Sequence, residues 1–124
     1  MFFLTLEGKV NVGRRKGRKL GFPTININVP TVIKTSQWGV YFSLIKIGDK
    51  FYPGVTHLGP PKTFSLSRAT CETHLLTFRQ DLYHQAVEKR LIFKFREVEK
   101  FPSIGRLKKQ MKKDIKAARK FFGL

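Results

Sequence analysis

The sequence predicts a mainly β fold: a small antiparallel barrel of roughly five or six short strands, followed by one C-terminal α-helix. Two observations support this class. Stretches rich in β-branched and aromatic residues are separated by turn signals about every eight to twelve residues. Only the last stretch of the chain repeats its apolar side chains with a helical period. At 124 residues, the chain is long enough for one core, and we expect a single domain over residues 1–124.

The predicted strands, in chain order, are residues 3–12, 24–28, 38–47, 51–58, 69–78 and 86–96. Gly48-Asp49-Lys50 gives a hairpin turn signal, and residues 30–36 form a connection. Alternation in the last strand predicts one apolar face and one basic face. The apolar face would hold Leu91, Phe93 and Phe95, and the basic face would hold Arg90, Lys94 and Arg96.

Residues 103–123 predict a capped amphipathic helix. Ser103 suits the N-cap position, and Gly123 supplies a stop. Apolar residues recur at spacings of three and four, at Ile104, Leu107, Met111, Ile115, Ala118 and Phe122. The opposite face is basic, with Arg106, Lys108, Lys109, Lys112, Lys113, Lys116, Arg119 and Lys120. Such a face is usually a solvated exterior, and we expect that role here.

The chain is strongly basic, with 25 Lys and Arg against 8 Asp and Glu and a formal net charge of +17. This field attracts nucleic acid, anionic membranes and small phosphorylated ligands alike. Cys71 is the only cysteine, which excludes an intrachain disulfide and a cysteine-rich zinc site and fits a cytoplasmic location. The sequence has no apolar run long enough for a membrane span, and residues 1–6 lack the features of a signal peptide.

A basic, glycine-rich loop at residues 13–21 precedes the short strand with Thr24 and Asn26. Glycines permit close backbone approach, so the loop could lay N–H groups around an anion. In an extended strand, Thr24 and Asn26 point to the same side, where their oxygens could hold Mg²⁺ on a nucleotide's phosphates. The spacing is neither a Walker A motif nor a dinucleotide fingerprint. On local chemistry alone, a solvated hairpin loop remains the alternative.

Glu72 is a candidate general base, because acidic residues are scarce and this one shares a strand face with His74, Leu76 and Phe78. A carboxylate at the mouth of an apolar face can take a proton from a substrate hydroxyl. The alternative is an ion pair with a neighbouring Lys or Arg. We expect His74 to be a packed or surface residue, since the histidines lack metal-ligand spacing.

Together these segments make the sequence similar to the riboflavin kinases of bacteria and eukaryotes, a module that in bacteria usually forms the C-terminal half of a bifunctional FAD synthetase. The similarity extends nearly end to end, in family order. The matching segments are Gly8-Lys9-Val10, residues 17–26 (GRKLGFPTIN), Gly39-Val40-Tyr41, residues 54–59 (GVTHLG), Lys62-Thr63-Phe64, residues 72–84 (ETHLLTFRQDLYH) and residues 95–103 (FREVEKFPS).

The resemblance implies a six-stranded Greek-key barrel and Mg²⁺-dependent transfer of the γ-phosphoryl of ATP to the 5′-hydroxyl of riboflavin, giving FMN. Thr24 and Asn26 would bind Mg²⁺, Glu72 would be the base, and the loop at 13–21 would fold over the phosphates. The expected nucleotide and flavin contacts are Gly13, Lys16, Gly17, Arg18, Gly21, Thr24, Asn26, Tyr83, Arg96 and Ser103. The expected partners are riboflavin and ATP, with no membrane and with nucleic acid disfavoured. We expect a cytoplasmic monomer or a module of a bifunctional FAD synthetase.

Four residues depart from the family pattern. Ile25 replaces a small Ala, His57 an Asn, Lys62 a Pro and His84 a turn Gly, whose loss is costly if the turn needs φ > 0. These departures keep open a catalytically impaired domain that binds flavin or nucleotide. The net charge of +17 keeps open a second alternative, a basic β-barrel that binds nucleic acid.

Overall fold

The computed structural model describes residues 4–11, 24–60, 69–77 and 82–124. Its strands are β1 (Leu4–Lys9), β2 (Ile25–Asn28), β3 (Gly39–Ile47), β4 (Lys50–Gly59), β5 (Thr70–Leu75) and β6 (Ala86–Arg96). A short 3-10 helix, η1 (Thr35–Gln37), precedes β3, and the helix α2 (Ile104–Phe121) follows β6. The predicted strands and helix are confirmed, with ends displaced by a few residues.

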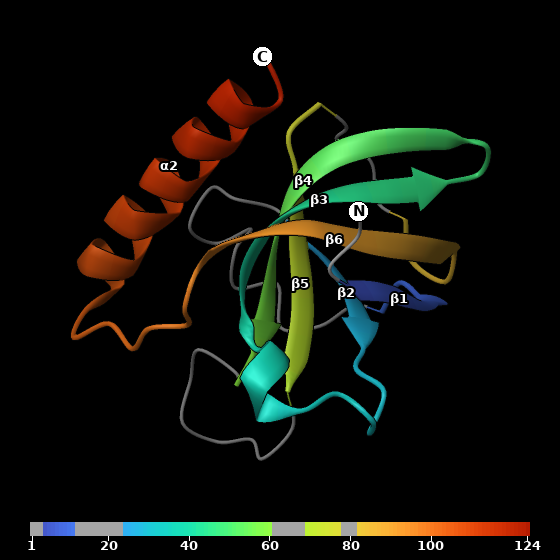
Figure 1. Cartoon of the computed structure of the whole chain (residues 1–124), viewed down its shortest axis with the longest axis horizontal. Helices are drawn as coiled ribbons and strands as arrows, with labels where there is room; N and C mark the ends of the chain where they lie inside the picture. The colour runs from blue at the N-terminus through green and yellow to red at the C-terminus, as the bar shows by residue number, and fades with distance from the viewer. Residues whose placement is uncertain (1–3, 12–23, 61–68, 78–81) are drawn as a thin grey trace.

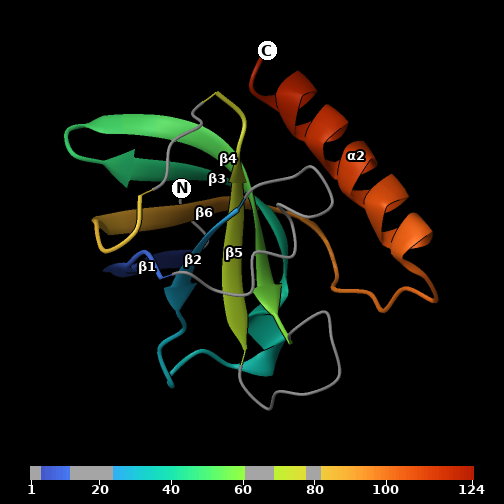
Figure 2. The same cartoon turned by 180° about the vertical axis from the view of Figure 1, so that it is seen from behind.

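The strands form one antiparallel sheet in the order β1-β6-β3-β4-β5-β2. The two end strands of this order approach each other, since a Cβ built on Gly8 would stand 3.2 Å from the Cβ of Ile27. Glycine permits this close approach. The sheet therefore curls into a nearly closed barrel (Figures 1 and 2), which confirms the predicted fold class.

The barrel interior is the main hydrophobic core, because every second side chain of each strand turns inward. Three buried hydroxyls share this interior: Ser43 and Thr56 lie 2.7 Å apart, as do Thr56 and Thr73. They therefore satisfy one another away from water. The buried apolar members are Leu6, Val10, Ile25, Ile27, Tyr41, Ile45, Leu58, Cys71, Leu75, Leu82, Val87 and Leu91.

Helix α2 lies along one side of the barrel (Figures 1 and 2). Its buried Ala118 packs with Val40, Phe42 and Val55, which project from the outer face of β3 and β4. A second, smaller core therefore joins the helix to the sheet. The described helices include none long and apolar enough to cross a membrane.

The predicted ends of the helix are confirmed. The Ser103 hydroxyl accepts a hydrogen bond from the Arg106 N–H at 3.2 Å, and Gly123 has φ 72°. Ile104, expected on the apolar stripe, is instead 60% exposed, whereas Leu107 is buried. All eight basic residues of the opposite face are exposed, as expected.

The prediction of uniform faces on β6 is wrong. Leu91 pairs with Ser43 and is fully buried inside the barrel, whereas Phe93 pairs with Phe42 and is 46% exposed. Two register irregularities between β3 and β6 cause the change, because an extra residue in one strand moves the following side chains to the other face. Phe95 stacks on Phe42 at the outer face. The basic residues do not share one face either: Lys94 pairs with the inward Tyr41, whereas Arg90 and Arg96 pair with outward residues.

Candidate active site

A single cross-strand row organises the outer face of the barrel. Asn26 pairs with Glu72, Glu72 with His57, His57 with Val40, and Val40 with Arg96. Residues directly opposite each other in an antiparallel pair project to the same face. The row therefore brings residues from five strands onto one surface, with the predicted metal ligand and the predicted base as immediate neighbours.

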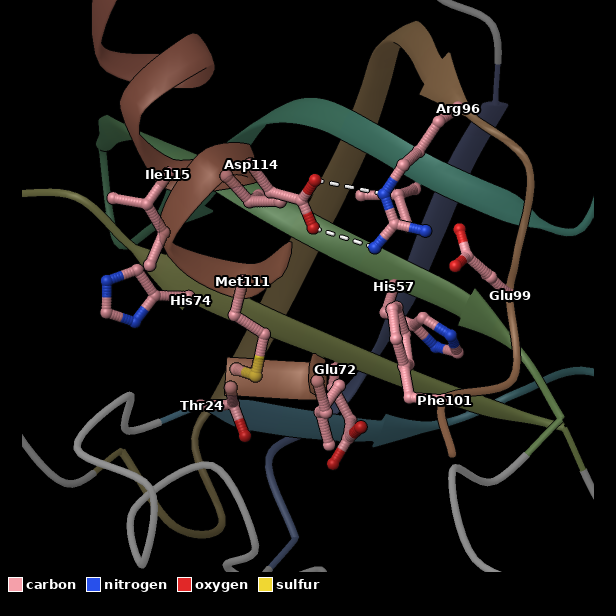
Figure 3. Close-up of a pocket in the computed structure, with 13 residues that line it drawn as sticks. Thr24, His57, Glu72, His74, Arg96, Glu99, Phe101, Met111, Asp114 and Ile115 are labelled. Carbon is pink, nitrogen blue, oxygen red and sulfur yellow. Dashed lines mark hydrogen bonds and ion pairs between the residues drawn. The ribbon is translucent and has the colours of Figure 1, made fainter. Parts of the chain in front are cut away.

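A pocket lies between this row and helix α2, and Figure 3 shows the labelled side chains converging on it. About 530 Å³ of space is free of protein atoms, including solvent on the open side. The lining residues come from the end of β2, from β3 to β6, from the segment after β6 and from the helix. They are Thr24, Val40, Val55, His57, Glu72, His74, Arg96, Glu99, Phe101, Leu107, Met111, Asp114 and Ile115.

Thr24 lines the pocket at its β2 side, and Asn26 lies two residues further along the same strand side. Thr24 Oγ1 is buried and has no hydrogen-bond partner among the described residues, and Asn26 is 6% exposed. Buried polar atoms are normally paired, so an unpaired hydroxyl at a pocket calls for an explanation. Hydroxyl and amide oxygens are ligand types that Mg²⁺ accepts. The pair therefore fits the expected metal, whereas the described residues contain no group of three His, Cys, Asp or Glu side chains that could hold one.

Glu72 stands half-buried in the pocket wall, between Asn26 and His57 in the row. A carboxylate here can accept a proton from a hydroxyl group bound in the pocket. His57 and His74, which the sequence left without a catalytic role, also line the pocket. Because the imidazole groups flank Glu72 on the same outer face, they extend the polar part of the wall.

Arg96 is fixed by a buried carboxylate from the helix. Asp114 accepts hydrogen bonds from Arg96 Nε at 2.9 Å and Nη2 at 2.8 Å, and a third from Gln110 Nε2 at 2.9 Å. Sequence reasoning missed Asp114. It is the only acidic residue of α2 and lies among the apolar positions of the stripe, and this placement was the available signal for a buried ion pair.

The structure brings Thr24, Glu72 and Arg96 together at the pocket and sets Asn26 opposite Glu72 in the row, although Asn26 itself does not line the pocket. It places two other predicted residues elsewhere. Tyr83 packs against the barrel interior, and Ser103 is exposed and caps α2. Neither lines the pocket. The predicted contacts Gly13, Lys16, Gly17, Arg18 and Gly21, and the substituted Lys62, lie outside the described residues.

His84 has φ 68°, so the turn after Tyr83 does use the backbone conformation that favours glycine. The expectation about the cost of this substitution is therefore met in its geometry. The His84 N–H donates to the Val10 carbonyl at 2.7 Å, and neither residue lines the pocket. The backbone strain at His84 is therefore outside the cross-strand row that carries Asn26, Glu72 and Arg96.

The family model described as "Flavokinase: Riboflavin kinase" matches residues 2–122. The RNA-binding riboflavin kinase RibR of Bacillus subtilis (strain 168) is 38% identical over 96% of this chain and 51% of its own length. The bifunctional riboflavin kinase/FMN adenylyltransferase of Escherichia coli (strain K12) is 36% identical over 96% of this chain and 38% of its own length. The chain thus spans about half or less of these curated relatives.

Among solved structures, the fold is similar to one titled a macrolide-efflux protein, from Streptococcus pneumoniae. The TM-score is 0.80 with 29% sequence identity, over 94% of this chain and 38% of the other. The match supports the arrangement of strands and helix described above, within a larger chain of its own.

Proposed function

The chain belongs to the riboflavin kinase family, and from this premise we propose that it transfers the γ-phosphoryl group of ATP to the 5′-hydroxyl of riboflavin. The hydroxyl oxygen forms the new bond to phosphorus, the bond from phosphorus to the β–γ bridging oxygen breaks, and ADP leaves as FMN forms. Glu72 takes the hydroxyl proton. A reaction that consumes ATP and a buried free thiol at Cys71 both agree with the cytoplasm.

The observation that supports this proposal most directly is the register of β2 against β5. It sets Asn26 opposite Glu72. The Thr24 hydroxyl, which has no partner within the described part of the chain, lies near the same surface. Phosphoryl transfer asks a protein mainly for positioning and charge neutralisation. The base must therefore lie next to the oxygen atoms that bind the metal and phosphates. The pairing of Asn26 with Glu72 would meet this requirement.

Mg²⁺, when bound with the phosphates, would neutralise charge on the transferring group. Thr24 and Asn26 would hold it, and neutral oxygens suffice because the phosphates are negatively charged. The apolar wall formed by Val55, Phe101 and Met111 suits a flat aromatic ring, as ligand pockets commonly do. Arg96, held by Asp114, would orient a polar edge of that ring.

The test is FMN formation from riboflavin, ATP and MgCl₂, followed by chromatography. We expect E72Q to reduce kcat by about 10² to 10⁴, the usual contribution of a general base. E7Q is the matched control, since Glu7 is an exposed carboxylate of β1 that does not line the pocket, and it should remain near the parent. N26A should raise the Mg²⁺ concentration needed, while N28A, two residues further along β2, should not. Absence of FMN from the parent would refute the proposal.

We also propose a second function, RNA binding by helix α2. All eight basic residues on its outer face are exposed, and its only acid, Asp114, is buried. From Arg106 to Lys120 the face is about 21 Å long at the rise of an α-helix. The Bacillus subtilis relative is named as RNA-binding, and a dense cationic stripe is the electrostatic footprint expected for a nucleic-acid backbone.

Fluorescence anisotropy with a single-stranded RNA oligonucleotide, over a range of KCl concentrations, tests this second function. K109Q/K112Q/K116Q should weaken binding. It should also reduce the steepness of the plot of log binding constant against log salt concentration by up to about two. K46Q/K50Q removes cations from the β3–β4 hairpin and should have little effect. Equal losses in the two variants would show only non-specific attraction by net charge.

A further inference from the structure

Lys89 is a buried amine inside the barrel that the proposed reaction does not use. It is 0% exposed and belongs to β6, where it pairs with Leu6 of β1 and Ile45 of β3. Both neighbours are members of the apolar core. Lysine is almost never fully buried without partners, so the hydrogen-bond partners of Lys89 indicate its structural role.

The Lys89 amine reaches across the interior to the opposite wall. Nζ donates to the carbonyl oxygen of Ile25 at 2.9 Å and to that of Cys71 at 3.0 Å. Ile25 belongs to β2 and Cys71 to β5. A carbonyl oxygen has two lone pairs and can accept this bond in addition to a strand ladder bond. One side chain therefore ties two neighbouring strands to a third one across the barrel.

These two carbonyls lie directly next to the site. Ile25 stands between Thr24 and Asn26, and Cys71 immediately precedes Glu72. Because side chains alternate along a strand, the residues that Lys89 holds face the interior while their neighbours face the pocket. The position of Lys89 thus bears on both strands at the point where Asn26 and Glu72 meet.

Strand β2 needs such support more than the others. It has only four residues and ends the strand order, with its ladder on β5 alone. Toward β1, the pairing of the described residues is a single isolated bridge, between Asn11 and Asn26. A short end strand with few partners is locally weak, and its functional side chains need sub-ångström placement.

We propose that Lys89 is a positioning residue that fixes β2 against β5 and so holds Thr24 and Asn26 in register with Glu72. This inference rests on the proposed kinase function for its kinetic consequence, but not for its structural one. Loss of the amine would loosen Thr24 and Asn26. Arg96 would stay in place, because Asp114 of α2 holds it independently of Lys89.

The test compares K89M, which has similar length but no donor, with the parent. We expect KM for Mg·ATP to rise about tenfold, KM for riboflavin to stay within about twofold, and the amides of residues 25–28 to exchange faster with deuterium. The urea midpoint should be equal or higher, because apolar replacement of a buried charge is often neutral or stabilising. S43A is the matched control, because it removes a buried hydroxyl that bonds to Gly54 and Thr56 of β4 and not to β2. It should leave KM for Mg·ATP and the exchange of residues 25–28 at the parent values, while the urea midpoint falls.

Unchanged exchange and unchanged KM for Mg·ATP in K89M would overturn the proposal, as would an equal loss in S43A. If K89M does not fold, K89L is measured in the same way, and failure of both to fold would overturn it by making Lys89 purely structural. If the parent forms no FMN, the kinase proposal fails separately. The exchange of residues 25–28 and calorimetric binding of Mg·ADP then decide on Lys89 by themselves.

Discussion

Replacing Asp114 with Ala should destabilise the protein by about 3 kcal/mol. Asp114 is 4% exposed and accepts two hydrogen bonds from Arg96 and one from Gln110. Removing one partner of a buried ion pair costs about 3–5 kcal/mol because the other charge stays behind. The Arg96 side chain is 18% exposed, so water can reach part of the guanidinium, and the lower end of that range applies.

Urea unfolding followed by the fluorescence of Trp38, the single tryptophan, measures this change. Trp38 packs against the barrel core, so its emission reports on the whole barrel. The matched control is E97Q, which removes a pair to Lys94 at 2.7 Å in which Glu97 is 77% exposed. An exposed pair contributes at most about 1 kcal/mol and often nothing measurable. The double variant R96M/D114L should recover most of the loss, because it leaves no unpaired charge.

A loss below about 1 kcal/mol in D114A, equal to that in E97Q, would refute this reasoning. It would mean that the guanidinium regains full hydration when its partner is removed, and so that helix α2 lifts from the sheet at little cost. A double variant no better than D114A would contradict the charge argument specifically, since the two would then share only lost packing.

Three further predictions concern other sites. Burial lowers the pKa of Lys89, so the unfolded chain holds a proton that the native chain binds less well. The relevant pH range lies between that lowered pKa and 10.5. In this range, the free energy of unfolding of the parent relative to K89M should rise by at most about 1.4 kcal/mol per pH unit. Urea titrations that give the same difference at every pH would contradict this. Burial raises the pKa of the Cys71 thiol, so a disulfide reagent should react in urea and barely react with the native protein, as absorbance would record. H84G should stabilise by about 0.5–1 kcal/mol, because φ is 68° there; a lower thermal midpoint would argue against strain.

The sequence allowed the strands, the helix and the neighbourhood of Thr24, Asn26 and Glu72 to be predicted, because all depend on local patterns. Alternation places Thr24 and Asn26 on one side of a strand, and the structure puts that side outward. The uniform faces of β6 failed since alternation assumes an unbroken pleat, and two irregularities break it between Leu91 and Arg96. Nothing in a single sequence marks where an extra residue enters a ladder.

Long-range partners were the other gap. Asp114 and Arg96 are 18 residues apart, and Lys89 and Ile25 are 64 apart. Charge patterns show that a residue is unusual for its position, but they do not identify its partner. For Tyr83, a matching motif predicts a ligand contact, and the structure shows the residue packed against the core.

The alternation of β2 and β5 also determines which genetic changes this protein tolerates. Ile25, Ile27 and Cys71 pack in the interior, while Asn26 and Glu72 pair on the outer face. Point substitutions can therefore change the outward-facing residues while the interior packing stays intact. The activity can change in this way without a change of fold. Insertion or deletion of one residue in either strand has the opposite effect. It would exchange the two sets, placing an amide in the apolar interior and isoleucine at the pocket, so we expect length in these strands to be far more constrained than residue identity.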